Sequence, residues 1–163
     1  MQKAIAEFKN QLVKLKVTAP PTHHVVLGSG FGNALSDSEV ITNEWAEKGE
    51  IPFSQIPGIS VSSVVDHKGS FRFYENKQSR QHIIFQMGRL HGYEGHSAKQ
   101  VVAPVLLTRM CGVKNYLLTN AAGGLQKNLA PGDVVLIRDH VNLTGQNPLV
   151  AEYSSLGPRF PDM

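Results

Sequence analysis

Three short, mainly apolar runs in this sequence each lead into a turn that contains glycine. The runs HVVL (24–27), HIIFQM (82–87) and VKNYLLT (113–119) lead into GSGFG, GRLHG and NAAGG. Short apolar runs bounded by turn residues are typical of strands buried in a sheet. The recurrence of strand, glycine turn and helix therefore indicates an α/β protein with a mixed sheet.

Two helices are predicted beside these strands. Apolar residues recur at helical spacing near the N-terminus, which predicts a helix over 2–16: Ile5, Phe8, Leu12 and Leu15. The segment TAPP (18–21) should end it. Ser97 can cap a second helix over 98–111, and Gly112 can end that helix.

The remaining strands are expected from shorter patterns. The runs 71–74 and 82–87 flank the polar segment 75–80, which predicts an antiparallel hairpin. Further strands are predicted at 62–65 and 134–137. The segments 51–58 and 142–163, rich in turn-forming residues, are expected to be loops.

Length and composition limit the protein classes. The 163 residues suit one domain over 1–163, and 41% hydrophobic with 18% charged residues favours a globular fold. The net charge of +3 comes from scattered basic residues, unlike a nucleic-acid-binding arm. No apolar run approaches the ~20 residues of a membrane span, and the first segment lacks a signal-peptide core. We expect a cytoplasmic protein without nucleic-acid or membrane partners.

The turn GSGFG (28–32) follows the first strand. Successive backbone N–H groups in such turns favour an anion, and the Ser29 hydroxyl can add a donor. The dinucleotide fingerprint fails because its third glycine would fall on Asn33, and no Gly-Lys-Ser/Thr of a P-loop follows. A tight turn without a ligand remains the alternative.

The turn NAAGG (120–124) has the same character. Small residues after a strand let a ligand approach the backbone closely, and ligands in open α/β sheets bind beyond the carboxyl ends of strands. Two such turns after different strands suggest one shared crevice, and close packing without a ligand remains the alternative.

The segment GRLHGYEGH (88–96) carries the densest chemistry. If the strand continues, Arg89, His91 and Tyr93 lie on one face, and an arginine beside an imidazole suits an oxyanion. A metal site fits less well, because His91 and His96 are not at the i, i+4 spacing of a helical zinc motif. A polar surface loop remains an alternative. His67 is either a second basic group or part of a solvated loop.

Five segments together resemble the trimeric purine nucleoside phosphorylase family. They occur in the family's order and cover nearly the whole chain after the first helix: VVLGSGFG (25–32), GRLHGYEGH (88–96), LTNAAGGL (118–125), GDVVLIRDHVNLTGQNPL (132–149) and RFPDM (159–163). The methylthioadenosine phosphorylases are related, but the YEGH portion is similar to the purine nucleoside branch.

The resemblance implies a fold and a reaction. The fold is three-layered, with a central mixed β-sheet flanked by helices. In the reaction, phosphorolysis converts a purine (deoxy)ribonucleoside reversibly to the free base and (deoxy)ribose 1-phosphate. Inorganic phosphate is a co-substrate, and no cofactor or metal is implied. The transition state resembles an oxocarbenium ion, so positioning and electrostatics dominate.

The resemblance also assigns residue roles. Five residues match phosphate-site positions: Ser29, His67, Arg89, His91 and Ala121. Four match the ribose or nucleoside side: Tyr93, Asn120, Ala121 and Phe160. His91 and Glu94 are the catalytic candidates, with Glu94 orienting His91 or binding phosphate-linked water. Phe160 matches a residue that reaches a neighbouring subunit, which implies a homotrimer.

Members of the family continue past RFPDM. The resemblance therefore implies an N-terminal portion, incomplete at the C-terminus, with most of the phosphate site, part of the ribose site and no base pocket. The alternative is a catalytically inactive fragment or subunit that binds phosphate or nucleoside, or assembles with a missing C-terminal half.

Overall fold

The computed structural model describes residues 1–31, 33–61 and 69–149. The chain forms two compact units, Met1–Ala121 and Ala122–Met163. All helices and strands found among the described residues belong to the first unit. In the second unit, the described residues 122–149 form turns, bends and irregular segments without helix or strand.

The first unit is built on a five-stranded mixed sheet with the strand order β2-β3-β4-β1-β5. Strand β1 pairs in parallel with β4 and β5, whereas β3 pairs antiparallel with β2 and β4. The sheet and the hairpin predicted from the sequence are thus confirmed. The strand bounds are β1 His23–Leu27, β2 Trp45–Pro52, β3 Ser70–Asn76, β4 His82–Met87 and β5 Asn115–Leu118.

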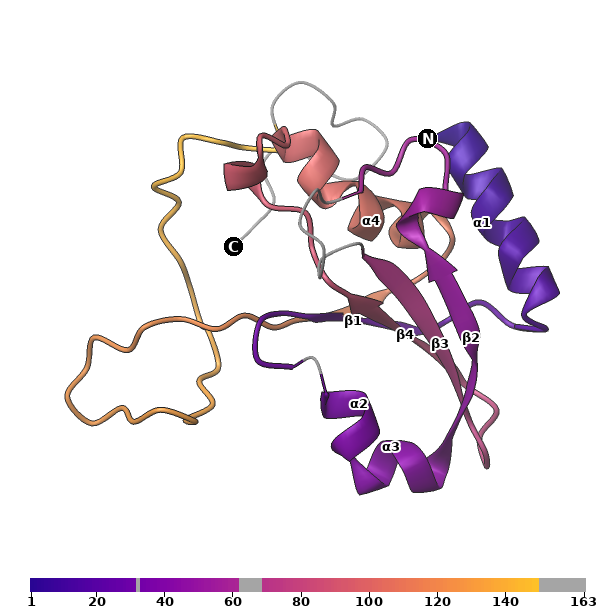
Figure 1. The fold of residues 1–163 in the computed structure, drawn as a ribbon, viewed down its shortest axis with the longest axis horizontal. Coiled ribbons are helices and arrows are strands. Elements are labelled where there is room, and N and C mark those ends of the chain that lie inside the picture. Colours follow the sequence, from indigo (N-terminus) through magenta and orange to yellow (C-terminus); the bar gives the residue numbers. More distant parts are fainter. Residues whose placement is uncertain (32, 62–68, 150–163) are drawn as a thin grey trace. The chain divides into compact units, whose positions relative to one another are not determined.

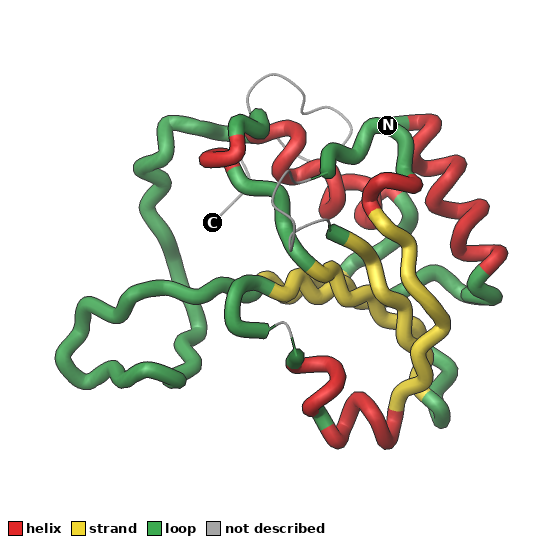
Figure 2. Tube along the Cα trace, in the orientation of Figure 1, coloured by secondary structure: helices red, strands yellow, loops and turns green. Residues whose placement is uncertain are grey.

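Helices cover both faces of this sheet (Figures 1 and 2). Helices α1 (Gln2–Lys14) and α4 (Ala98–Met110) contribute to a buried cluster with the sheet residues Phe71, Phe73 and Ile84. On the other face lie the short helices α2 (Ala34–Asp37) and α3 (Glu39–Glu44). Their apolar residues pack in a second cluster: Leu35 and Ile41, with Leu27, Tyr74 and Phe85 of the sheet. The predicted three-layer α/β architecture is confirmed.

Helix α1 ends two residues earlier than predicted, at Lys14. Lys16 adopts a left-handed backbone with φ 56°. Its N–H donates to the Val13 carbonyl at 3.0 Å, and the Val17 N–H donates to the Leu12 carbonyl at 3.0 Å. These two bonds form a Schellman motif, which stops the helix before the prolines are reached.

Helix α4 begins with the predicted Ser97 cap. The Gln100 N–H donates to the Ser97 hydroxyl at 3.4 Å, and the Ser97 N–H donates to Gln100 Oε1 at 2.8 Å. This capping box fixes where the helix starts. It also anchors the end of the segment 88–96 that carries the candidate chemistry.

Some predicted elements differ from the structure. The prediction of a loop at 51–58 is wrong for its first residues, because residues 51 and 52 complete β2 and a 3-10 turn follows at Phe53–Gln55. The strand predicted at 134–137 is wrong, because the described segment 122–149 contains no strand. The side chains there are largely exposed, with Val134 92% and Leu136 88% accessible to solvent. The strand predicted at 62–65 lies outside the described residues.

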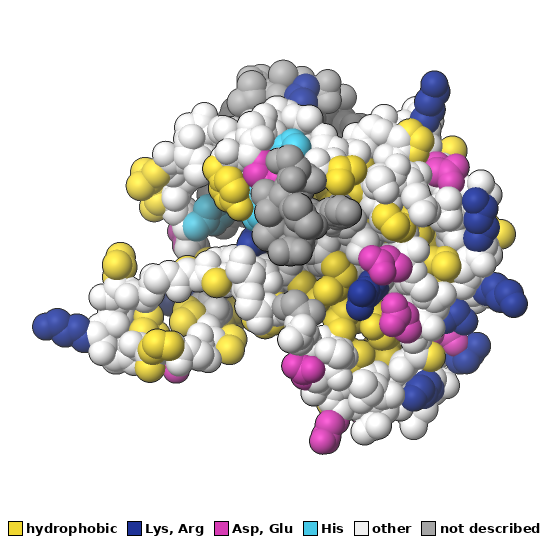
Figure 3. Space-filling view, in the orientation of Figure 1, with side chains coloured by type: hydrophobic (Ala, Val, Ile, Leu, Met, Phe, Trp, Pro, Cys, Tyr) yellow, Lys and Arg dark blue, Asp and Glu magenta, His cyan; other side chains and the backbone are white. Residues whose placement is uncertain are grey.

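Charged side chains of both signs are interspersed over α1 and the neighbouring sheet edge (Figure 3). Among the described residues, no helix combines the length and apolar character needed to cross a membrane. The expectations of no nucleic-acid partner and of a cytoplasmic location stay predictions.

Candidate functional site

The carboxyl ends of three parallel strands meet at one edge of the sheet. In the strand register Leu27 lies beside Met87 and Val26 beside Leu118, so β4, β1 and β5 end at the same level. The turns that follow them carry five of the predicted site residues: Arg89 and His91 after β4, Ser29 after β1, and Asn120 and Ala121 after β5. The sheet therefore brings the three turns to one edge.

Two of these turns are in direct contact at Gly28. The Gly28 N–H donates to the Thr119 hydroxyl at 2.9 Å, and that hydroxyl donates to the Val26 carbonyl at 2.9 Å. A Cβ on Gly28 would lie 2.3 Å from the Thr119 carbonyl oxygen and 2.9 Å from the Asn120 Cα. Only glycine fits this approach, because real Cβ atoms do not come so close to backbone.

The turn after β1 exposes Ser29 and holds Gly30 at φ 89°. Phe31 N–H closes the turn by donating to the Gly28 carbonyl at 3.2 Å. A helix that follows such a turn can add the positive end of its dipole. Helix α2 has four residues, so its aligned peptide dipoles are too few to give a substantial field.

The turn after β4 is held by a hydrogen bond from the side chain of Gln86. Strand β4 stops at Met87, and Gly88 takes φ 80°. The buried Gln86 side chain donates its Nε2–H to the Gly88 carbonyl at 2.9 Å. The strand alternation expected to align Arg89 with His91 and Tyr93 is therefore wrong, since the strand ends before Arg89.

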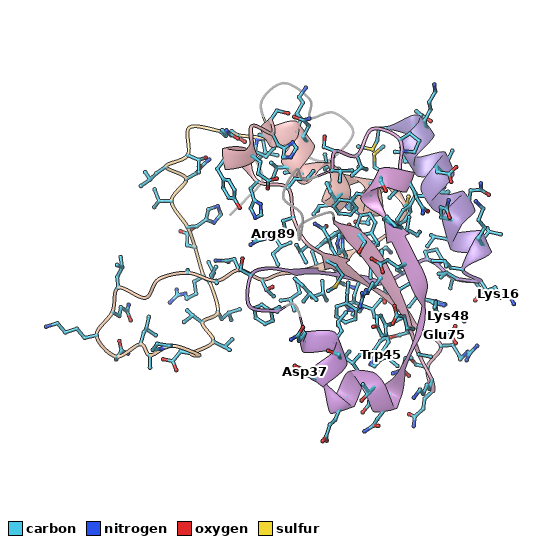
Figure 4. The ribbon with its side chains drawn as sticks, in the orientation of Figure 1. Lys16, Asp37, Trp45, Lys48, Glu75 and Arg89 are labelled. Carbon is cyan, nitrogen blue, oxygen red and sulfur yellow. The ribbon has the colours of Figure 1, made fainter. Side chains whose placement is uncertain are left out.

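Arg89 is half-buried at this edge and forms no ion pair with a carboxylate of the described residues. In Figure 4 it lies at the opposite end of the sheet from Lys48 and Glu75, which pair with each other at 3.2 Å. A half-buried guanidinium without a carboxylate partner suits an anionic ligand.

His91 is held by two neighbours in the 3-10 turn Gly92–Glu94. Its Nδ1 lies 2.7 Å from Glu94 Oε1, and its ring stacks on Tyr93 with centroids 4.7 Å apart and planes 15° apart. The Glu94 side chain is only 3% exposed, whereas Tyr93 is 80% exposed. A buried carboxylate on Nδ1 makes that nitrogen the proton donor and directs Nε2 away from the carboxylate.

Two supporting residues were missed in the sequence, His24 and Gln86. His24 is fully buried and its Nδ1 lies 2.9 Å from the Thr108 hydroxyl. His24 Nε2 and Gln86 Oε1 are buried without a hydrogen bond of good geometry. Burial lowers the pKa of His24 to about 4, although the Gln86 side chain partly opposes the shift. The sequence signal for these two residues was a polar side chain within an apolar run, His24 in 24–27 and Gln86 in 82–87.

Not all predicted site residues can be placed. His67 and Phe160 lie outside the described residues. Within the described ranges, no group of three or more His, Cys, Asp or Glu side chains could hold a metal ion. A surface depression of about 640 Å³ runs along α1, and none of the predicted site residues lines it. The candidate site is therefore placed at the carboxyl ends of β4, β1 and β5 and not in this depression.

The sequence model of the phosphorylase superfamily matches residues 25–163, a range that contains all three turns. The chain belongs to this superfamily. Purine nucleoside phosphorylase 1 of Geobacillus stearothermophilus is 37% identical over all of this chain and 57% of its own length. The chain thus spans little more than half the length of that relative.

Solved superfamily structures have the same fold. Purine nucleoside phosphorylase from Schistosoma mansoni in complex with inosine has a TM-score of 0.73 and 30% identity, and the match covers 99% of this chain and 54% of that one. Its isoform 2, with cytosine and ribose-1-phosphate, has a TM-score of 0.75 and 31% identity over 99% and 54%. The matches do not favour the alternative of a catalytically inactive fragment or subunit.

Proposed function

We propose that this chain forms the phosphate-binding part of a purine nucleoside phosphorylase. The reaction converts a purine (deoxy)ribonucleoside and inorganic phosphate reversibly into the free base and (deoxy)ribose 1-phosphate. The observation that carries the proposal is the meeting of the turns after β4, β1 and β5, with Arg89, Ser29 and Asn120, at one sheet edge. The relatives named above support it, since they are purine nucleoside phosphorylases.

The phosphate is assigned to the turns after β1 and β4. The Arg89 guanidinium supplies a planar fork of donors, and the exposed Ser29 hydroxyl supplies another donor. Ala121 leaves room for close approach at the neighbouring turn. His67 is assigned to the same anion by the family resemblance.

His91 and Glu94 form the proposed catalytic pair. Glu94 holds the proton of a neutral His91 ring on Nδ1, so Nε2 is the ring nitrogen that accepts a proton from a protonated phosphate oxygen. A phosphate oxygen then bonds to the anomeric carbon while the glycosidic bond breaks. The bonding electrons leave with the base, which gains the proton that inorganic phosphate loses as it becomes the sugar phosphate. Phosphate is itself the nucleophile, so the reaction needs no cofactor.

The sugar is assigned to the outer side of the site. Tyr93 exposes its ring beside His91, and Asn120 lies on the turn that Gly28 contacts. Phe160 is assigned to a neighbouring subunit's ribose, which makes the full-length protein a homotrimer. Light scattering tests this part, and a monomer would contradict the assignment of Phe160.

The function is tested by the release of hypoxanthine from inosine by the full-length protein. We expect release that requires inorganic phosphate and yields ribose 1-phosphate. Release that proceeds equally without phosphate would identify a nucleosidase that uses water and would overturn the proposal.

Phosphate binding by the 163-residue chain can be measured directly by calorimetry. Arg89→Ala should weaken binding about 10- to 100-fold, the range of a hydrogen bond to a charged group, without unfolding the protein. Arg109→Ala is the matched control, because Arg109 is exposed in the last turn of α4. Equal affinity in both variants would contradict the role of Arg89.

A further inference from the structure

Glu94 lies between two histidines. Its Oε1 is 2.7 Å from His91 Nδ1, and its Oε2 is 3.8 Å from His96 Nε2. The two imidazoles thus approach different oxygens of one carboxylate. The side chains are 3% exposed for Glu94, 19% for His91 and 14% for His96, so all three are largely shielded from water.

The local backbone creates this arrangement. The 3-10 turn Gly92–Glu94 brings His91 and Glu94 three positions apart onto one side. Gly95 follows in a left-handed conformation with φ 86°, where a side chain would be strained. This reversal places His96 against the second carboxylate oxygen immediately before the Ser97 cap of α4.

The burial of the Glu94 carboxylate explains why the contact with His96 matters. A carboxylate that is almost fully withdrawn from water requires partners on both oxygens, because an uncompensated buried charge is costly. The contact with His91 is at Oε1, and His96 Nε2 lies 3.8 Å from Oε2. When protonated, the His96 ring balances the charge at Oε2 and restricts the rotation of the carboxylate plane.

We infer that His96 is a positioning residue of the phosphorolysis site. It holds Glu94 from the side opposite His91, so that Oε1 stays on Nδ1 and His91 keeps one tautomer and one ring orientation. The inference rests on the proposed function, in which His91 faces phosphate. It adds a residue that does not touch the phosphate and acts through Glu94.

The test compares His96→Leu, which removes the polar ring, with His96→Arg, which supplies a permanent cation at this position. His23→Leu is the matched control, because His23 is exposed at the start of β1. Long-range ¹H–¹⁵N spectra report the His91 tautomer, and calorimetry reports the affinity for inorganic phosphate. Fluorescence of Trp45, the single tryptophan, checks folding.

We expect His96→Leu to lower the Nδ1–H tautomer fraction of His91 and to weaken phosphate binding about two- to fivefold, the range of a weak ion pair. His96→Arg should restore both signals, and His23→Leu should change neither. If His96→Leu unfolds, His96→Gln, which keeps a polar side chain without the charge, takes its place and should give the same changes in smaller degree.

Two results would overturn the inference. One is an unchanged His91 tautomer in His96→Leu. The other is an equal loss of affinity with leucine and with arginine, which would indicate packing alone. Failure of the proposed function looks different, since the wild-type chain would not bind phosphate. The tautomer comparison would then decide the role of His96 by itself.

Discussion

The contact between the turns after β1 and β5 makes a sharp prediction for Gly28→Ala. The added methyl group would lie 2.3 Å from the Thr119 carbonyl oxygen, 2.9 Å from the Asn120 Cα and 3.0 Å from the Thr119 carbonyl carbon. All three are backbone atoms, so no side-chain rotation can relieve the overlap. The turn after β5 must move away from β1 by about 1 Å to restore ordinary contact distances.

The cost follows from this displacement. Forcing an extra methyl group into a well-packed site costs about 1–3 kcal/mol. The movement also strains the bond from the Gly28 N–H to the Thr119 hydroxyl, whose loss adds about 1 kcal/mol. We therefore expect the free energy of unfolding to fall by about 2–4 kcal/mol, a large share of the stability of a typical domain.

The assay is urea denaturation followed by Trp45 fluorescence, together with phosphate calorimetry. Gly30→Ala is the control: Gly30 has φ 89°, but no atom of the described residues lies within 4 Å of an added Cβ. It should cost only the left-handed backbone penalty of about 1–2 kcal/mol. The reasoning is refuted if Gly28→Ala is no less stable than Gly30→Ala, or if it binds phosphate as tightly as the wild type.

Three further predictions concern other parts of the first unit. Burial lowers the pKa of His24 from 6.5 to about 4, so the unfolded chain binds a proton at this residue at a higher pH than the folded chain does. Urea titrations should therefore show the free energy of unfolding falling by up to about 3 kcal/mol as the pH drops from 6.5 towards 4. A constant free energy of unfolding over this range would contradict the prediction. Ser97→Ala should lose about 1 kcal/mol in thermal unfolding through its capping box. Leu117→Lys on edge strand β5, where Leu117 is 57% exposed, should reduce self-association in sedimentation.

Much of the first unit could be predicted because its signals are local. The apolar runs at 24–27 and 82–87 became β1 and β4, and the serine cap before 98–111 became the start of α4. Each prediction needed only the pattern of one segment. The prediction at 134–137 used the same kind of pattern and was wrong, because an apolar run becomes a strand only where another strand pairs with it.

Strand β2 and the burial of Glu75 near the end of β3 could not be predicted from such patterns. Strand β2 includes Gly49 at φ 139° and a register shift between Glu47 and Gly49, so its apolar residues do not alternate regularly. The polarity of segment 75–80 predicts a turn, yet Glu75 is a buried residue of β3. It pairs with Arg80 and His82 of the same hairpin and with Lys48 of β2. Burial of a charge depends on all its partners, and the contact with Lys48 depends on the pairing of β2 with β3, which the polarity of 75–80 does not reveal.

The same limit applies to the candidate site. The sequence identified Ser29, Arg89, His91 and Asn120 as chemistry-bearing residues, but their convergence depends on strand order. Strand β1 lies between β4 and β5, so the Gly28 turn has a neighbour on each side. A different order would separate the turns and leave three weak glycine motifs. Because β1 lies between β4 and β5, a displacement of Gly28 should disturb the turns on both sides of it. The effect of Gly28→Ala on phosphate affinity therefore tests the arrangement of all three turns and not one contact alone.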